Sequence, residues 1–366
     1  MFKVNRWAFS LAVLMFLQPV QADESAPAEE VSQPIWQGAT QLVKFSVNEG
    51  TWLNLTLSPD GKTLAFDMLG DLYTLPVEGG AAKRLTTTRA QEVQPQFSPD
   101  GRELAYISDV GGGHNLMIMN LETGEERALT KESFRLITNP RWHPDGSGLV
   151  ARKHFTGTRS LGSGEMWFYH LDGGSGVQLT EKRNEQQDEN DPVYSPDGRF
   201  LFYTQDATPG PYFQYNKNPH AGIYLTRRLD LETGEDIALL GGPGGAVRPE
   251  PSPDGRYIAY VKRVQTQSVL MLYDRKTGSN RALYSDLDHD QQEVWALFGL
   301  YPNFAWTPDS SAIYFWAKGG IHKLDLATQS VDEIPFEAEV EVEVAKTQKA
   351  EPEVGGSSFS AHMLRD

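Results

Sequence analysis

Cysteine is absent from this sequence of 366 residues. A disulfide framework, a thiol nucleophile, a cysteine-liganded metal site and a lipid-anchored cysteine are therefore excluded for this chain. Basic residues are also scarce, with 33 Lys and Arg against 49 Asp and Glu, and the formal net charge is -16 at pH 7. Because nucleic-acid binding requires clustered Lys and Arg side chains, this balance argues against a nucleic-acid partner.

Long apolar runs are confined to the beginning of the chain, so we expect no membrane span in the mature protein. Residues 1–22 have the pattern of a signal peptide. Two basic residues, Lys3 and Arg6, precede an apolar stretch and a small-residue cleavage site at Ala22. The sequence thus predicts a periplasmic or secreted protein. Residues 23–39 are acidic and rich in Pro and Ala, which is typical of a flexible leader.

Local catalytic motifs are absent as well. None of the eight histidines forms an HxH or HExxH pattern, no GxSxG elbow occurs and no P-loop is present. We therefore assign no catalytic residue and no cofactor to this chain, and whether the whole protein is an enzyme stays open.

A four-residue turn motif, SPDG or a close variant, occurs six times along the chain. Its first residues are Ser58, Ser98, His143, Ser195, Ser252 and Thr307. Proline presets φ in such a turn, aspartate accepts a backbone N–H, and glycine supplies a positive φ. The motif recurs about every 50 residues, which is a period typical of the blades of a β-propeller.

The residues around each motif indicate four strands per repeat. In the second repeat the apolar stretches 104–107 and 115–118 follow the motif, and a short stretch at 127–130 closes the unit after a glycine turn. A single sheet of this kind cannot bury both of its faces, so neighbouring sheets must stack into a ring. The sequence therefore predicts an all-β fold, a β-propeller of about six four-stranded blades over residues 40–334.

Two segments lie outside the repeats. Residues 43–47 have the pattern of a strand, and we hypothesise that they form the outer strand of the last blade. Residues 335–366 are a low-complexity tail in which residues 337–344 alternate as an exposed or edge strand would. Residues 359–366 resemble the first strand of a further blade, which suggests a truncated chain. We expect deletion of residues 335–366 to raise the soluble yield.

One loop is a candidate binding site for a protein or peptide. It is rich in proline and carries three amphipathic rings, those of Tyr212, Phe213 and Tyr215. Such rings offer apolar area together with a polar tip, as partner-binding loops often do. The alternative is a loop that packs on its own blade.

A second loop is a candidate metal site. Asp286, Asp288 and Asp290 alternate along it and would project hard oxygen ligands of the kind that calcium prefers. The spacing is not that of an EF-hand. A solvated acidic loop explains the same pattern.

The residues also suggest a family. The pattern over residues 97–109 resembles the TolB-like repeats (PD40, WD40-like) of exported bacterial propellers. Three further stretches, residues 49–73, 244–249 and 288–310, resemble the N-terminal region of exported bacterial propeller–amidohydrolase proteins. The resemblance covers residues 40–366.

In that family a metal-dependent hydrolase domain with an HxH pair follows the propeller. The resemblance thus implies a non-catalytic N-terminal part, with a divalent metal such as zinc in a missing C-terminal domain. Arg248, within the similar stretch GGAVRP, joins the candidate binding residues on this ground. Two alternatives stay open: a complete periplasmic TolB-like protein-interaction module, and a propeller that gates substrate to a peptidase domain.

Overall fold

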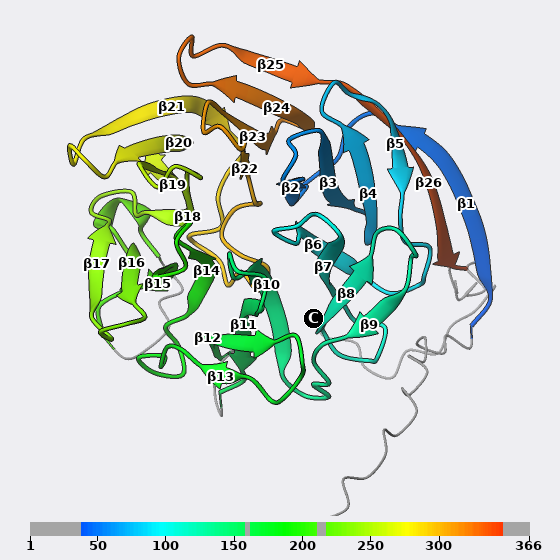
Figure 1. The fold of residues 1–366 in the computed structure, drawn as a ribbon, viewed down its shortest axis with the longest axis horizontal. Coiled ribbons are helices and arrows are strands. Elements are labelled where there is room, and N and C mark those ends of the chain that lie inside the picture. The colour runs from blue at the N-terminus through cyan, green and yellow to red at the C-terminus, as the bar shows by residue number, and fades with distance from the viewer. Residues whose placement is uncertain (1–37, 158–161, 211–216, 347–366) are drawn as a thin grey trace, which may run out of the picture. The chain divides into compact units, whose positions relative to one another are not determined.

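The computed structural model describes residues 38–157, 162–210 and 217–346. Within these ranges the chain forms 26 strands and one short 3-10 helix. The strands make six sheets around a common centre (Figure 1). The predicted all-β propeller with six blades is therefore confirmed. Among the residues described, no helix has the length and apolar character needed to cross a membrane.

Blades 1 to 3 follow one another in chain order. Blade 1 is built on β2 (Leu55–Leu57), β3 (Thr63–Met68), β4 (Asp71–Pro76) and β5 (Gly80–Arg84). Blade 2 contains β6 (Glu92–Phe97), β7 (Glu103–Ser108), β8 (Asn115–Asn120) and β9 (Glu126–Ala128). Blade 3 contains β10 (Leu136–Trp142), β11 (Gly148–Phe155), β12 (Ser163–His170) and β13 (Val177–Gln178).

Blades 4 to 6 repeat this plan, with the first strand of each nearest the centre (Figure 1). Blade 4 contains β14 (Glu189–Tyr194), β15 (Phe200–Asp206), the 3-10 helix η1 (Pro219–Ala221), β16 (Tyr224–Asp230) and β17 (Asp236–Leu240). Blade 5 contains β18 (Val247–Pro251), β19 (Tyr257–Val264), β20 (Gln267–Asp274) and β21 (Asn280–Leu287). Blade 6 contains β22 (Ala305–Trp306), β23 (Ala312–Ala317), β24 (Gly320–Asp325) and β25 (Val331–Ile334).

The repeated motif closes the turn between the first two strands of a blade with its own side chains. In blade 2, Ser98 Oγ donates to Asp100 Oδ1 at 2.7 Å. The same oxygen accepts from Glu103 N at 2.9 Å, where β7 begins. Gly101 donates its N–H to Ser98 O at 2.9 Å and has φ +74°, which glycine adopts without a Cβ clash.

Two strands extend blade 1 beyond the repeats: β1 (Thr40–Val47) and β26 (Phe336–Ala345). The order in this sheet is β1-β26-β5-β4-β3-β2, and Figure 1 shows β1 and β26 along the outside of blade 1. The hypothesis that residues 43–47 complete the last blade is therefore wrong, because β25 is the outer strand there. Residues 337–344 do form a strand, but β1 covers its outer edge, so the expected edge position is also wrong.

The ring closes between blades 6 and 1 without a shared strand. Trp316 Nε1 donates to Gly50 O at 2.7 Å, and Gly50 N donates to Gly319 O at 2.9 Å. The Trp52 ring packs 6.2 Å from the Trp316 ring and 5.7 Å from the Tyr301 ring, measured between centroids. Because β26 follows blade 6 in the chain and pairs with β5, it also straps the last blade to the first.

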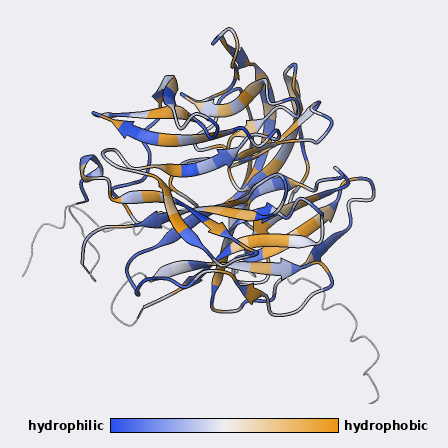
Figure 2. Ribbon diagram, turned by 60° about the vertical axis from the view of Figure 1, so that its left-hand side comes forward, coloured by the Kyte–Doolittle hydropathy of each residue, from blue (hydrophilic) through white to orange (hydrophobic). Residues whose placement is uncertain are grey.

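The apolar core lies between successive blades. Between blades 3 and 4, for example, Val150 and Met166 pack against Leu201 and Tyr203, and none of these four is more than 1% exposed. Figure 2 shows apolar residues along the strands of the sheets. Burial of apolar surface contributes about 25 cal/mol per Å² to stability, so these contacts between blades stabilise the ring.

Candidate functional site at the centre of the ring

A polar residue precedes the inner-strand proline in four consecutive blades. These residues are Gln94, Asn139, Asp191 and Arg248, and their φ values lie between 53° and 58°. A positive φ is strained for residues other than glycine and persists only where the surroundings impose it. Here the surroundings link blade to blade, since Asn139 N donates to Gln94 Oε1 at 2.7 Å and Arg248 N donates to Asp191 Oδ2 at 3.3 Å.

Residues 288–304, which we call the central segment, connect β21 to β22. Figure 1 shows this segment, in yellow to orange, extending into the middle of the ring. Four of its carbonyls accept hydrogen bonds from side chains of blades 2 to 5. The pairs are Gln94 Nε2 to Phe298 O (2.8 Å), Thr138 Oγ1 to Leu297 O (3.2 Å), Asn190 Nδ2 to Ala296 O (3.5 Å) and Arg248 Nε to Tyr301 O (2.7 Å). The protein's own chain is therefore fixed to the inner wall of the ring.

Arg248 anchors the central segment. Its side chain is 1% exposed, and Nη2 lies 3.0 Å from Asp191 Oδ1. Gly299 packs directly on this ion pair, because a Cβ at Gly299 would lie 2.1 Å from Arg248 Nη2. The guanidinium thus holds a part of its own chain, and the prediction that Arg248 binds a partner stays a prediction.

A pocket of about 520 Å³ opens beside the central segment, between blades 1 and 2. We call it the mouth pocket; its lining includes Trp52, Asp67, Arg89, Gln91 and Phe298. Burial raises the pKa of Asp67 to about 6, although N–H donors of Asn54 and Gln94 lower it. The pocket is thus lined by groups of mixed polarity: two aromatic rings, a carboxyl group and a guanidinium. Pockets that bind peptides or small ligands have linings of this kind.

A second cluster of buried charges lies between blades 3 and 4. The Arg152 side chain is fully buried, and its Nη2 donates to Asp188 Oδ1 at 2.7 Å and contacts His154 Nδ1 at 2.9 Å. Gly164 makes room for it, because a Cβ there would lie 2.3 Å from Arg152 Nε. The His154 ring packs on Trp295 of the central segment at 5.4 Å. Buried ionisable groups with shifted pKa values are frequent at functional sites.

Glu189, at the start of β14, belongs to this cluster and gives it a pH dependence. Burial raises the pKa of Glu189 to about 7, against hydrogen bonds from Thr180 and Gln205. Because the pKa of Glu189 is higher in the folded state than in the unfolded state, protonation of this group stabilises the fold. This contribution to stability is fully present below the unfolded-state pKa near 4.5, and it is lost as the pH rises through 7.

We therefore expect Glu189→Gln, which cannot ionise, to flatten the pH dependence. Relative to wild type, its free energy of unfolding should rise by up to about 3 kcal/mol between pH 4.5 and 8. Urea unfolding at several pH values measures this difference. Glu122→Gln, at an exposed turn, controls for the loss of one charge. Parallel pH profiles of Glu189→Gln and wild type would show that Glu189 does not titrate in this range.

The structure does not bring the three aspartates of the predicted metal loop together. Asp290 is buried and pairs with Arg263, with Oδ1 2.7 Å from Nη2. Asp288 and Asp286 instead face Lys318, through its backbone N at 2.6 Å and its Nζ at 3.3 Å respectively. In the part of the chain that is described, no group of three or more His, Asp or Glu side chains is placed to hold a metal ion. This arrangement does not favour calcium, and the calcium hypothesis stays a prediction.

The predicted aromatic loop, with Tyr212, Phe213 and Tyr215, lies outside the described residues. The anchoring role of the residues before the inner-strand prolines was not predicted at all. A signal for it exists in the sequence, because the residue before each of these prolines is polar at the same repeat position in blades 2 to 5. An inner strand that served only to pack the core would be expected to have an apolar residue at this position.

The described residues define a six-bladed β-propeller whose centre contains its own chain. The family model of the TolB beta propeller domain matches residues 37–215. The chain thus carries a TolB-like β-propeller domain, which confirms the resemblance of residues 97–109 to TolB-like repeats.

Two curated relatives are peptidases. The chain is 28% identical over 220 residues to the uncharacterized peptidase YuxL of Bacillus subtilis, a match that covers 56% of this chain and 28% of that protein. It is 27% identical over 274 residues to dipeptidyl-peptidase 5 of Porphyromonas gingivalis, covering 71% of this chain and 36% of that protein. The chain thus spans about a third of the length of these two relatives.

A solved structure shows the same fold. TolB from Acinetobacter baumannii superposes with a TM-score of 0.59 at 17% sequence identity, over 78% of this chain and 65% of that one. The described propeller is therefore like those of TolB and of peptidases, and at this identity the likeness concerns the fold.

Proposed function

We propose that this chain is the binding propeller of an exported hydrolase, and that a protein or peptide docks over the mouth pocket. The observation that carries the proposal is the central segment. It is bound to the inner strands of blades 2 to 5 and extends into the middle of the ring (Figure 1). The side chains available to a partner, such as Trp52 and Arg89, therefore line the mouth pocket beside the central segment rather than a central channel. Binding on a face suits a domain that selects or holds a partner.

Two classes of hydrolase are supported by different observations. The stretches at residues 49–73, 244–249 and 288–310 resemble propeller–amidohydrolase proteins, in which a metal such as zinc would be held by residues outside this chain. The relatives YuxL and dipeptidyl-peptidase 5 favour a peptidase instead. The signal-peptide pattern of residues 1–22 supports a periplasmic or secreted location for either class.

The coding DNA downstream of codon 366 decides between these classes. A continuing frame with an HxH motif supports the amidohydrolase, and one with a GxSxG elbow supports the peptidase. A stop codon followed by an unrelated gene overturns the hydrolase part of the proposal. It would leave a TolB-like binding module.

Docking at the mouth pocket is tested with the whole chain and an array of random decapeptides. Gln91 is exposed and lines the pocket, so Gln91→Trp should fill the entrance and lower peptide binding by about tenfold. Gln267→Trp, at the exposed start of β20, is the matched control and should bind as wild type does. Equal binding by both variants, or binding of no peptide by wild type, would overturn the docking site.

A further inference from the structure

The sheet of blade 1 is not fully paired on the inner side of β26. The parallel pairing of β26 with β5 ends at Ala338, opposite Ala82. From there β26 continues to Ala345 and pairs with β1 over its full remaining length. Across the described residues, its other edge is contacted instead by side chains: Tyr73 Oη donates to Glu339 O at 3.4 Å, and Arg89 Nε donates to a carboxylate oxygen of Glu343 at 2.6 Å.

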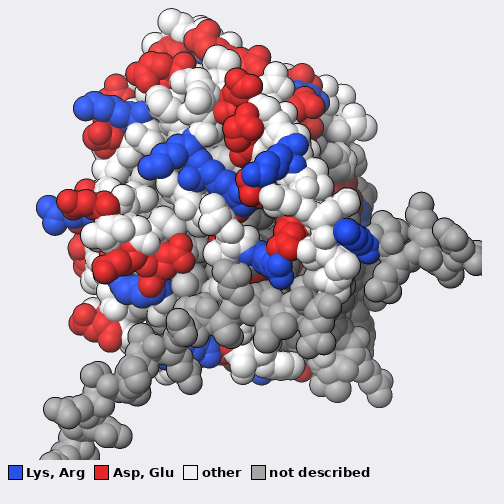
Figure 3. All heavy atoms as spheres, turned by 90° about the vertical axis from the view of Figure 1, so that its right-hand side faces the viewer, with Lys and Arg blue, Asp and Glu red and all other residues white. Residues whose placement is uncertain are grey.

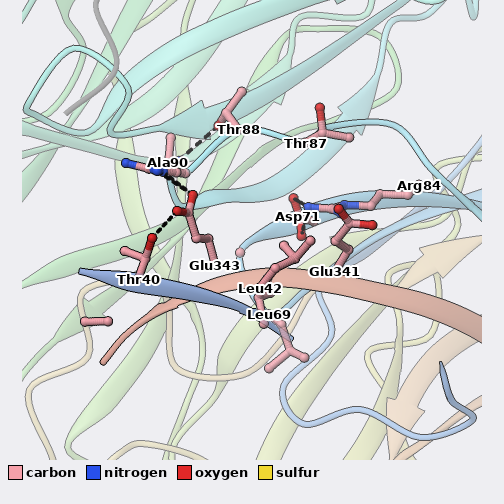
Figure 4. A pocket seen from close by; sticks show the side chains of 14 residues that line it. Thr40, Leu42, Leu69, Asp71, Arg84, Thr87, Thr88, Ala90, Glu341 and Glu343 are labelled. Carbon is pink, nitrogen blue, oxygen red and sulfur yellow. Dashed lines mark hydrogen bonds and ion pairs between the residues drawn. The ribbon is translucent and has the colours of Figure 1, made fainter. Parts of the chain in front are cut away.

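A cavity of about 690 Å³ lies along this unpaired edge. Residues of β1 and β26 line one side of it, and Asp71, Arg84 and the loop over residues 87–90 line the other. Figure 4 shows these side chains around the cavity, with Glu343 joined to Thr40 across the two outer strands. We call this cavity the strand slot.

The backbone of β26 directs hydrogen-bonding groups into the strand slot. Alternate residues of a strand present their N–H and C=O groups to opposite edges. Lys346 N donates to Ala39 O on the β1 side, whereas Glu339 O accepts from Tyr73 on the slot side. Glu341 and Glu343 share the parity of Glu339, so their N–H and C=O groups face the slot. An unpaired edge of this kind is a template for an added strand.

The side chains of β26 indicate which strand would fit. Glu339, Glu341 and Glu343 alternate with Val340 and Val342, and Val340 is only 1% exposed. Opposite charges and β-branched pairs are favoured between neighbouring strands, whereas like charges are not. A strand in the slot should therefore carry Lys or Arg opposite the glutamates and Val or Ile opposite the valines.

The ion pairs that Glu341 and Glu343 already make do not prevent them from pairing with an added strand. Glu341 pairs with Lys44, whose side chain is 62% exposed, and Glu343 pairs with Arg89, whose side chain is 42% exposed. Exposed ion pairs of this kind stabilise a fold by at most about 1 kcal/mol. Leu42 adds exposed apolar area at the rim of the cavity. Figure 3 shows acidic and basic side chains interspersed on this side of the molecule.

We propose that blade 1 accepts an additional strand from a partner protein, an extended segment in which basic and β-branched residues alternate. The strand adds to the inner edge of β26 by main-chain hydrogen bonds, and its basic residues pair with Glu341 and Glu343. This proposal does not require docking at the mouth pocket, although the two cavities adjoin and share Leu69, Gly70, Arg89 and Ala90 in their linings.

The probe is a fluorescent peptide of sequence VKVRVKV, titrated with the whole chain by polarisation, and EVEVEVE is the charge control. Glu343→Pro removes an N–H that faces the slot and leaves the pairing with β1 in place, because proline is tolerated where no ladder hydrogen bond is lost. We expect it to weaken VKVRVKV binding by at least about tenfold, with a melting temperature lowered by no more than about 4 °C through the loss of the exposed ion pair with Arg89. Glu343→Gln, which keeps the N–H, should weaken binding by about threefold.

Three results would overturn the proposal. Binding of VKVRVKV to Glu343→Pro at wild-type affinity would show that the β26 edge is not used. Equal binding of VKVRVKV and EVEVEVE would show that charge complementarity does not determine which strand binds. A wild-type dimer in analytical ultracentrifugation that Glu343→Pro abolishes, together with no peptide binding, would assign the slot to a second copy of this chain. Reversal of peptide preference in the double variant Glu341→Lys, Glu343→Lys would support the proposal without reference to stability.

Discussion

Replacing Gly299 by alanine is expected to lower the free energy of unfolding by about 3–5 kcal/mol, the range found when a buried ion pair is broken. Gly299 has φ +98°, and an added Cβ would lie 2.1 Å from Arg248 Nη2 and 2.7 Å from Asp191 Oδ1. Either the ion pair separates or the central segment moves away from the wall. The first route leaves two buried charges without their partner, and the second loses the hydrogen bond from Arg248 Nε to Tyr301 O that fixes the central segment.

The flexibility of an arginine does not relieve this clash. Arg248 is 1% exposed, and its Nε is already engaged by Tyr301 O at 2.7 Å. A shift of the guanidinium away from Gly299 therefore loses the hydrogen bond that holds the segment, besides the contact with Asp191. Because the surrounding inner strands are buried, no solvent is available to replace the lost partners.

The matched control is Gly278→Ala, in the outer hairpin of the same blade as Arg248. Gly278 also has a positive φ, +73°, but nothing lies within 4 Å of its added Cβ. The free energy of unfolding of this variant should fall only by the cost of the backbone strain, about 1–2 kcal/mol. Urea unfolding followed by tryptophan fluorescence measures both variants. If Gly299→Ala costs no more than Gly278→Ala, the ion pair does not depend on the close approach of the central segment.

The blade pattern could be predicted from the sequence because each turn is written locally. Ser98, Asp100 and Gly101 close a turn by themselves, so six copies at one spacing specify six blades. The site at the centre could not be predicted in the same way. Arg248 and Gly299 are 51 positions apart, as their numbers show, and nothing in either local sequence indicates that they touch. Contacts across the ring depend on how the blades are placed around it.

The pairing of the outer strands was missed for a similar reason. The acidic face of β26 suggested an exposed edge, whereas Phe336, Ala338 and Val340 on its other face are buried against blade 1. Alternation identified the strand, since one face is apolar and the other is charged. It did not show that β1, from the beginning of the chain, would cover the second edge, because pairing between distant strands leaves no local mark.

Ending the chain after Ile334 is expected to destabilise the propeller by more than about 5 kcal/mol, because even a single buried Phe→Ala change costs about 3–5 kcal/mol. This truncation removes β26, whose Phe336, Ala338 and Val340 are no more than 4% exposed and belong to the core of blade 1. It also leaves β1 without its only strand partner among the described residues and exposes the edge of β5. The structure thus leads us to expect a lower soluble yield, the opposite of the expectation from the low-complexity sequence.

Ending the chain after Lys346 is the control, since it keeps β26 and its pairing with both neighbours. Its melting temperature and soluble yield should match those of the whole chain, whereas the shorter chain should be recovered mainly from the insoluble fraction. Comparing the two truncations separates the contribution of β26 from that of residues 347–366. A chain ending at Ile334 that is soluble and melts with the whole chain would show that β26 is not part of the stable propeller, and would remove the edge on which the strand slot depends.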